Sequence, residues 1–268
     1  MSLLLATWNV NSLRARLERV LEWIKYAEPD ILCLQETKMS DSVFPADVFR
    51  DAGYKSIHHG DGGWNGVAIL SRVGLDDPEE GMGEDVDEMG CRVVSASCSG
   101  IRVVSVYVPN GREVGSRFYY EKLDWMENLK SYIAQHYSPT SSLLVCGDFN
   151  VAPDDIDVWD TQVFEGATHV SKPERESLNG LLSWGLFDCF RLRYPQSGLY
   201  SWWDYRGGAF HKHQGMRIDL ILATKPVLSR CSFSLMDRNA RKGEKPSDHI
   251  PVMVWLEDVP MANADSES

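Results

Sequence analysis

Long apolar runs are absent from this chain of 268 residues. No stretch of about 18 consecutive apolar residues occurs, so the sequence predicts no membrane-spanning helix. The apolar segment from Ser2 to Ala6 is too short for the core of a signal peptide, and no basic region precedes it. We therefore expect this segment to be a first β-strand, and we expect a cytoplasmic protein with no membrane partner.

Cysteines with metal-ligand spacing are also missing. The six cysteines show no C-x-x-C spacing, and most of them lie in apolar runs that are typical of strands. This pattern predicts buried, reduced thiols rather than a zinc site or disulfides. No internal repeat, low-complexity tract or long linker divides the chain.

Basic residues are few, since 27 Lys and Arg stand against 39 Asp and Glu, a net charge of −12. Taken whole, this balance argues against binding to nucleic acid. The distribution is uneven, however, because an acidic segment at 76–88 and an acidic tail contrast with a basic region from Arg191 to His249. This asymmetry fits one face that binds a polyanion, and it also fits ordinary surface charge.

What the sequence does contain is many short apolar runs bounded by turn residues. They predict strands at 3–8, 31–34, 54–58, 67–70, 92–96, 102–108, 143–146, 217–223, 231–235 and 252–256. Helical periodicity predicts one helix from Leu13, capped by Asn11 or Ser12, and another over 117–135 with Leu123 among its inward residues. Ser171 and the Glu three residues later form a capping box before a third helix. Many strands with few helices favour an α/β fold of two packed mixed β-sheets flanked by helices.

Polar motifs stand at the ends of several of these apolar runs. They are Trp8-Asn9-Val10-Asn11, Leu34-Gln35-Glu36-Thr37, Gly147-Asp148-Phe149-Asn150, Arg217-Ile218-Asp219-Leu220-Ile221 and Pro246-Ser247-Asp248-His249-Ile250-Pro251. A strand end is where a side chain can emerge from the core into a cleft, and carboxylates, amides and an imidazole there suit metal-dependent phosphoryl transfer. Because the motifs span both halves of the chain, we expect one catalytic domain at 1–258 and a disordered acidic tail at 259–268.

Individual residues can be matched to this chemistry. A carboxylate at a buried strand end is costly unless it is paired or binds a cation, so Glu36 is the first candidate metal ligand. Asp148 and Asn150 are two apart, and on an extended chain both would face the same water. A carboxylate such as Asp219 would hold His249 in one tautomer and favour its cationic form, which can bind a phosphate oxygen.

Eight stretches, in this order, resemble the exonuclease III branch of the endonuclease/exonuclease/phosphatase superfamily, the bacterial AP endonucleases. The stretches begin at Thr7, Leu34, Asn65, Val106, Gly147, Ser201, Gly215 and Ser247, and together they cover residues 2 to about 257. The resemblance implies a four-layer α/β-sandwich of the DNase I-like type with the site at one end. It also implies a Mg²⁺-dependent DNA repair nuclease, in which Mn²⁺ is expected to substitute for Mg²⁺.

The same resemblance implies the reaction and the partner. The reaction is hydrolysis of the phosphodiester 5′ to abasic sites, with 3′–5′ exonuclease and 3′-phosphodiesterase or phosphatase activity. The partner is double-stranded DNA with abasic sites or blocked 3′ ends. We expect a monomer with no required protein partner.

The resemblance also assigns roles to residues of the site. It makes Asp148 the general base and Asn150 the amide that orients the attacked water. It places Asn9 and Asn11 near a metal held by Glu36, with Asp248 as an outer metal ligand.

Contacts with DNA follow from the same comparison. Tyr107 matches the tyrosine of the family that contacts the phosphate, and Asn110 follows it in the same loop. Trp202, Trp203 and Met216 match the pocket for a flipped-out abasic sugar. Adjacent residues on a strand face opposite ways, so we expect Trp202 to line the pocket and Trp203 to lie in the core. Candidate contacts to the phosphate backbone are Arg206, His211, Lys212, His213 and Arg217.

Two other functions fit parts of the pattern. A phosphatase of the same superfamily, acting on a small phosphoester or a lipid, would suit the net negative charge. A catalytically inactive DNA-binding relative would share the fold. Tyr107 and the Trp202-Trp203 pair argue against the first alternative, and the complete set of expected catalytic residues argues against the second.

Overall fold

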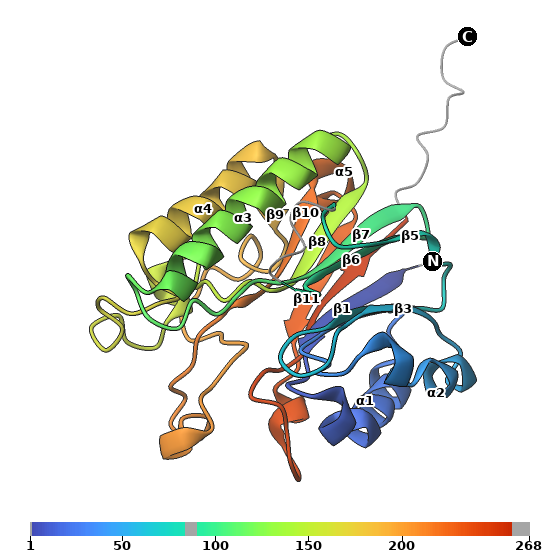
Figure 1. Cartoon of the computed structure of the whole chain (residues 1–268), viewed down its shortest axis with the longest axis horizontal. Coiled ribbons are helices and arrows are strands. Elements are labelled where there is room, and N and C mark those ends of the chain that lie inside the picture. The colour runs from blue at the N-terminus through green and yellow to red at the C-terminus, as the bar shows by residue number, and fades with distance from the viewer. Residues whose placement is uncertain (1, 84–89, 259–268) are drawn as a thin grey trace.

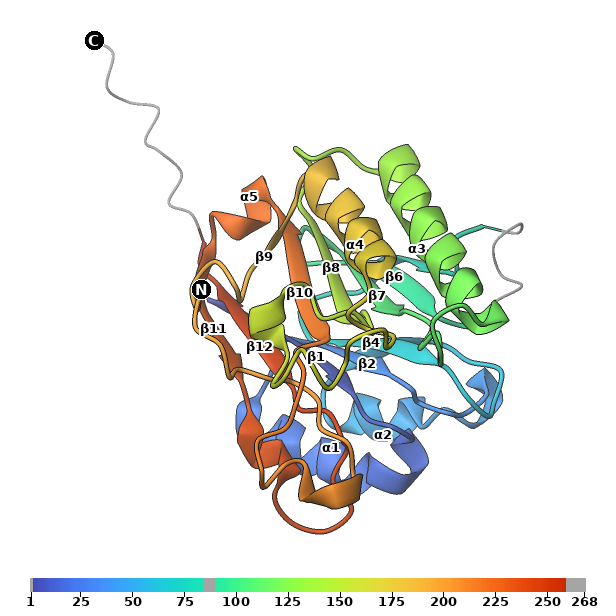
Figure 2. The ribbon, with the colours of Figure 1, turned by 90° about the vertical axis from the view of Figure 1, so that its left-hand side faces the viewer.

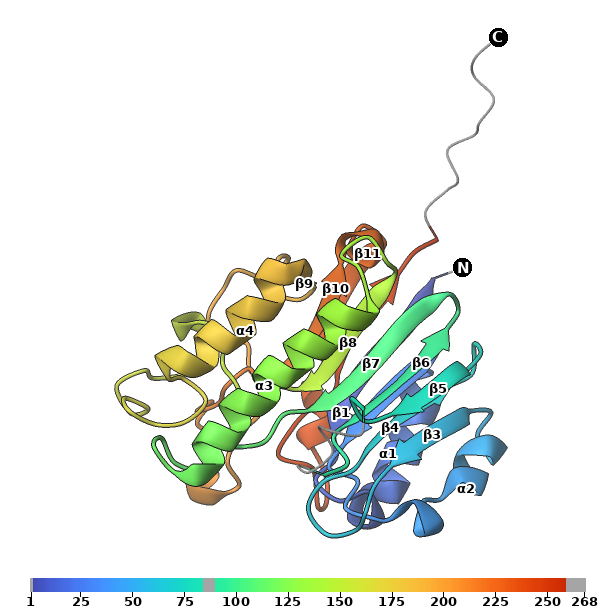
Figure 3. The same cartoon turned by 45° about the horizontal axis from the view of Figure 1, so that its top comes forward.

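Two six-stranded β-sheets stack face to face between two layers of helices, as a computed structural model shows (Figure 1). The structure describes residues 2–83 and 90–258, so the predicted tail and residues 84–89 of the acidic segment lie outside it. α1 (Leu13–Ala27) and α2 (Ala46–Asp51) cover one sheet, and α3 (Arg117–His136) and α4 (Lys172–Trp184) cover the other (Figure 3). The predicted four-layer α/β-sandwich is confirmed.

The first sheet has the strand order β11-β12-β1-β2-β4-β3. The bounds are β1 (Leu3–Asn9), β2 (Ile31–Gln35), β3 (Lys55–His59), β4 (Val67–Ser71), β11 (Cys231–Met236) and β12 (Val252–Leu256). β1 and β2 run parallel, and the other pairs are antiparallel. The last strand of the chain therefore lies beside the first.

The second sheet has the order β5-β6-β7-β8-β10-β9. The bounds are β5 (Asp76–Glu80), β6 (Val93–Cys98), β7 (Ile101–Tyr107), β8 (Leu143–Asp148), β9 (Leu186–Asp188) and β10 (Asp219–Thr224). Here β7 and β8 are the parallel pair, and the other neighbours are antiparallel.

The main core lies between the two sheets, where Ile69, Val103, Leu144, Ile221 and Val254 all belong to one buried cluster. Strands inside the sheets are covered on both faces, so β2, β4 and β8 are fully buried runs without the alternating exposure of a half-exposed sheet. Five of the cysteines (Cys33, Cys98, Cys146, Cys189 and Cys231) are buried free thiols, as predicted. No helix in the described part of the chain is long and apolar enough to cross a membrane.

Some local predictions are wrong. Residues 76–80 of the acidic segment, where no strand was predicted, form the exposed edge strand β5, which pairs with β6. Neither Asn11 nor Ser12 caps α1 with its side chain; the helix starts after a left-handed turn instead. α2 and β9 are short elements that the sequence pattern did not predict. By contrast, the capping box of Ser171 and Glu174 at the start of α4 is confirmed.

The two parallel pairs determine where the polar motifs meet. The carboxyl ends of parallel strands lie at the same edge of a sheet, which brings Asn9 beside Gln35 and Tyr107 beside Asp148. β10 and β12 run antiparallel to their neighbours, so the residues that begin these strands reach the same edges. The loops before β10 and β12, coloured orange and red, extend from this end of the molecule (Figure 2).

Candidate active site

A cross-strand pair of carboxylates forms the centre of the site. Asp148 ends β8 and stands directly opposite Asp219, the first residue of β10. Like charges at opposite positions repel, and both residues are buried, with exposed fractions of 1% and 0%. His249, just before β12, relieves this repulsion: its Nδ1 is 2.8 Å from Asp219 Oδ2 and its Nε2 is 3.7 Å from Asp148 Oδ2.

Glycine is required beside this pair. Gly147 has φ = 148°, and a Cβ added there would lie 1.9 Å from the carbonyl oxygen of Val106. Only a residue without a side chain lets β8 approach β7 this closely. The Gly-Asp sequence thus has a structural reason: Gly147 lets β8 pair closely with β7, and this pairing places Asp148 at the end of β8.

The two partners of this ion pair have shifted pKa values. Burial raises the pKa of Asp148 to about 7; the positive charge of His249 opposes this increase, and the charges of Asp219 and Glu36 add to it. Burial disfavours the imidazolium of His249, but the carboxylates of Asp219 and Asp148 outweigh it and raise its pKa to about 10. Near pH 8 the site therefore holds an ionised Asp148 and a cationic His249.

Glu36 joins the cluster from the first sheet. A carboxylate oxygen of Glu36, a carboxylate oxygen of Asp148 and a ring nitrogen of His249 all lie within 4.8 Å of one another. Asn9 connects the carboxylates, because its Nδ2 is 2.9 Å from Glu36 Oε1 and 2.9 Å from Asp148 Oδ2. Lys38 pairs with Glu36 at 2.9 Å.

This arrangement changes the expected role of Asn9. Its side-chain nitrogen faces the two carboxylates, and its oxygen accepts a hydrogen bond from the backbone N–H of Asn11. The side chain of Asn9 therefore bridges the two carboxylates, and its oxygen faces the backbone of Asn11.

Asn150 contacts Asp148, but the reason differs from the one predicted. The chain is not extended there, because Asn150 adopts the left-handed conformation with φ = 51°. Its backbone N–H donates to Asp148 Oδ1 at 2.9 Å, and its Nδ2 lies 3.3 Å from Asp148 Oδ2. Asn110 approaches from the neighbouring loop, with its Nδ2 3.3 Å from Asn150 Oδ1.

His169 is a residue of the site that sequence reasoning missed. Its Nε2 lies 3.4 Å from Asn110 Nδ2. Burial and the nearby charge of Lys122 lower its pKa to about 3, so the ring is neutral. His169 belongs to a loop with no recognisable motif, and it reaches the site because this loop packs beside the loop of Asn110.

Tyr107 ends β7 beside Asp148 and exposes 8% of its surface. Burial, together with the carboxylates of Glu36 and Asp148, raises the pKa of its phenol well above the usual value. The hydroxyl therefore stays protonated and can donate a hydrogen bond. The guanidinium of Arg92 lies over the ring, 4.7 Å from its centre.

Asp248 lies outside the carboxylate cluster and connects two other predicted residues. Its Oδ1 accepts from Asn11 Nδ2 at 2.9 Å, and its Oδ2 accepts from Trp202 Nε1 at 3.1 Å. Burial opposes its charge, but His249 and these hydrogen bonds lower the pKa of Asp248. Both oxygens hold side chains in place, so the geometry supports Asp248 as a support for Trp202 more than as a metal ligand.

The two tryptophans face opposite ways, as expected. Trp203 is fully buried in a small core cluster, whereas Trp202 is half-buried and packs near Met216. Met216 exposes only 1% of its surface and pairs through its backbone with Trp202. Met216 therefore lies beneath the surface that Trp202 presents.

The prediction that Arg217 contacts DNA phosphates is wrong. Its guanidinium is fully buried, with Nε 2.6 Å from Asp157 Oδ1 and Nη1 2.6 Å from Asp188 Oδ2. No phosphate can reach it without breaking these bonds. Arg206, His211, Lys212 and His213 are exposed in the same region, and Arg206 pairs with Asp204 at 2.7 Å.

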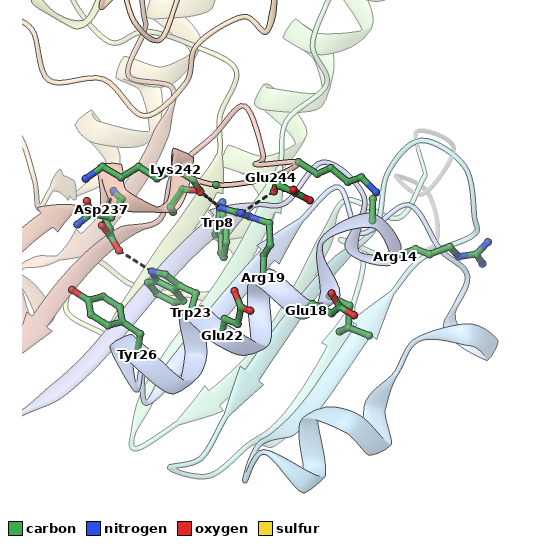
Figure 4. Close-up of a pocket in the computed structure, with 16 residues that line it drawn as sticks. Trp8, Arg14, Glu18, Arg19, Glu22, Trp23, Tyr26, Asp237, Lys242 and Glu244 are labelled. Atoms are coloured by element: carbon green, nitrogen blue, oxygen red, sulfur yellow. Dashed lines mark hydrogen bonds between the residues drawn. The ribbon is translucent and has the colours of Figure 1, made fainter.

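A separate groove of about 1,030 Å³ lies between α1 and the segment 237–245 (Figure 4). Its lining mixes charges of both signs and contains none of the predicted site residues. Arg19 reaches from α1 across it to the backbone oxygens of Ala240, Lys242 and Glu244, at 2.7–2.8 Å. α1 thereby anchors the segment that leads to Asp248 and His249.

Comparison with known proteins agrees with this geometry. The profile of the Endonuclease/Exonuclease/phosphatase family matches residues 6–249. The chain is 30% identical to exodeoxyribonuclease III of Haemophilus influenzae, over 94% of this chain and 98% of the relative. It is 32% identical to an exodeoxyribonuclease of Bacillus subtilis, over 92% of this chain and 97% of the relative.

Solved structures give the same result. An AP endonuclease from Archaeoglobus fulgidus superposes with a TM-score of 0.92 at 38% identity, covering 96% of this chain and all of that chain. The 3′ phosphatase NExo from Neisseria, bound to a product DNA hairpin, has a TM-score of 0.92 at 35% identity with the same coverage. These relatives act at two different places on DNA, one named for abasic sites and the other for 3′ ends.

Proposed function

The chain belongs to the Endonuclease/Exonuclease/phosphatase family, and we propose that it is a Mg²⁺-dependent DNA repair nuclease. The proposed reactions are hydrolysis 5′ to abasic sites and removal of nucleotides, phosphates or other blocking groups from 3′ ends of duplex DNA. One observation carries the proposal: Asp148, Asp219, His249 and Glu36 converge from both sheets on one charged, largely buried cluster. We propose that residues 1–258 act as one catalytic domain, in a cytoplasmic monomer.

The cluster fits a magnesium ion. Glu36 offers a carboxylate oxygen beside Asp148, and Mg²⁺ prefers one or two carboxylates together with water and phosphate oxygens. His249 is cationic near neutral pH, so it would not serve as a ligand. When bound, the metal would neutralise charge on the phosphate. The same oxygen donors would accept Mn²⁺.

Asp148 is the proposed general base. Its raised pKa of about 7 makes it a better proton acceptor at neutral pH than an ordinary aspartate. Asn150 would orient the attacked water through the amide that already contacts Asp148. Because the pair sits at the strand end, the water would be held between the protein and the phosphate.

Two donors would stabilise the phosphate during the reaction. His249, held by Asp219, can donate from Nε2 to a phosphate oxygen and share its developing negative charge. Tyr107 can donate from its protonated hydroxyl. Asn110 stands beside them as a neutral contact.

Around the centre, Trp202 and Met216 would form the pocket for the sugar, positioned by Asp248 and Asn11. Arg206 and the exposed residues His211, Lys212 and His213 would contact the DNA backbone. The acidic edge strand β5 would lie away from the DNA.

The test uses three duplex oligonucleotides: one with a single synthetic abasic site, one with a 3′-phosphate, and the same duplex intact. Each is incubated with Mg²⁺ and with EDTA. Mg²⁺-dependent cleavage 5′ to the lesion, or release of the 3′-phosphate, faster than degradation of intact DNA would support the proposal. Release of phosphate only from small phosphoesters would overturn it in favour of a superfamily phosphatase.

A further inference from the structure

The inner face of α3 carries a lysine where an apolar residue was expected. The periodicity predicts Leu123 as an inward residue, yet Leu123 is only half-buried and Lys122 is completely buried. Its stem packs against Gly111, where an added Cβ would lie 2.9 Å from Lys122 Cδ. A buried ammonium group is costly unless all of its hydrogens find acceptors.

Lys122 has three acceptors, one on each of three segments. Its Nζ lies 2.5 Å from Glu174 Oε1 on α4, 2.6 Å from the backbone oxygen of Asn150 and 3.4 Å from the backbone oxygen of Asn110. Two of the three are thus the main-chain oxygens of site residues. The ammonium group joins the loops after β7 and β8 behind the site.

Glu174 holds the lysine in place. Its Oε1 also accepts from the backbone N–H of His169 at 2.9 Å and from Thr168 Oγ1 at 2.7 Å. Its Oε2 accepts from Ser171 in the capping box. Burial disfavours its charge, but Lys122 and these hydrogen bonds lower the pKa of Glu174. The pair thereby links three loops that carry Asn110, Asn150 and His169.

We infer that Lys122, anchored by Glu174, is a positioning residue that holds the amide of Asn150 against Asp148. Asn150 is in the left-handed conformation, and its carbonyl is held by Lys122 on one side while its amide contacts Asp148 on the other. A buried ion pair is weak support for stability, since apolar residues of similar volume often replace one without loss. We therefore expect the Lys122–Glu174 pair to orient the loops that carry the amides, and to add little to stability.

The inference rests on the proposed function, and the experiment separates the two. Lys122→Met keeps an unbranched side chain and removes all three donors. Its control is Lys130→Met on the same helix, where a partly exposed lysine pairs with Glu127 at 2.9 Å, away from the site. The readouts are kcat and KM on the abasic and 3′-phosphate duplexes, with circular dichroism and thermal unfolding to verify the fold.

Because small displacements of catalytic groups cost roughly 10–100-fold in rate, kcat should fall by about that factor in Lys122→Met. KM should change less than about threefold, and the control should match wild type. In an Asn150→Ala background the same lysine substitution should cost only about threefold, because the amide it positions is absent.

Full kcat in a folded Lys122→Met protein would overturn the inference, and so would an equal loss in the Asn150→Ala background. If Lys122→Met does not fold, Glu174→Gln provides the same test, because it removes the charge that anchors the lysine and keeps the shape. If wild type cleaves neither duplex, the proposed function fails. The Lys122 comparison is then made with the small phosphoester that wild type does hydrolyse.

Discussion

Two buried clusters in this protein each hold a cation between two aspartates, and they differ in how fully they are bonded. The first cluster has a second cation as well, because Arg191 also pairs with Asp157. In the first, Arg217 lies between Asp157 and Asp188, and each of the four carboxylate oxygens accepts at least one hydrogen bond. In the second, His249 lies between Asp219 and Asp148. There, Asp219 Oδ1 is buried and has no hydrogen-bond partner among residues 2–83 and 90–258.

The difference separates a structural cluster from a reactive one. Burial opposes the charge of Arg217, but its two carboxylate partners outweigh that effect and raise its pKa above the usual value, so its charge is permanent. Burial raises the pKa of Asp148 to about 7, so this carboxyl group can gain or lose a proton near neutral pH, while His249, whose pKa is raised to about 10 by the neighbouring carboxylates, stays cationic there. A cluster with unused acceptors and such pKa values can exchange protons and bind a substrate, whereas a saturated one can only hold loops together.

Asp148→Asn gives the largest expected effect. The substitution keeps the shape and removes the proton acceptor, so kcat for DNA cleavage should fall by about 10²–10⁴-fold. The thermal unfolding midpoint should stay equal or rise, because the repulsion with Asp219 is lost. Cleavage assays and calorimetry measure both. An active Asp148→Asn protein would contradict the assignment of the base.

Arg217→Met tests the saturated cluster. Removing this cation leaves Asp188 without its ionic partner and Asp157 with Arg191 alone, and this should lower the free energy of unfolding by about 3–5 kcal/mol. The remaining folded protein should keep kcat within a few-fold of wild type. Urea unfolding followed by activity at low urea measures both, with exposed Arg206→Met as the control. A loss of kcat without a loss of stability would show that the two clusters are not distinct.

The pH dependence of cleavage should be bell-shaped. Asp148 is protonated and inactive as a base below about pH 7, and His249 loses its proton above about pH 10, so kcat/KM should fall on both sides. In Asp219→Asn both limbs should move to lower pH, because Asp219 raises both pKa values. The activity lost relative to wild type should therefore be larger at pH 9 than at pH 7. If both limbs of the pH profile of Asp219→Asn matched those of wild type, Asp219 would not influence the two groups that titrate during the reaction.

Arg206→Ala gives the smallest expected effect. This exposed arginine can contribute only one contact to the DNA backbone, so KM should rise a few-fold while kcat stays constant. The slope of log KM against log salt concentration should decrease by about one, because one phosphate contact is lost. An unchanged salt dependence would place Arg206 outside the DNA interface.

Prediction from sequence was most accurate for local features. The short apolar runs located β2, β8 and β10 to within one or two residues at each end, and Ser171 and Glu174 located the capping box of α4. It failed where the partner was distant in the chain: Arg217 was placed on the DNA face because its neighbours are basic, although Asp157 and Asp188 bury it. His169 was missed for the same reason.

The sequence by itself determined which residue types stand at the strand ends, because apolar runs, glycines and polar motifs are local properties. It therefore supplied Glu36, Asp148, Asp219 and His249 as candidates and excluded zinc-type spacing. Only the tertiary structure decided that Asp148 and Asp219 face each other in register, and that α3 turns Lys122 inward and Leu123 partly outward. Strand register and helix rotation depend on packing between segments far apart in the chain, and no local pattern records that packing.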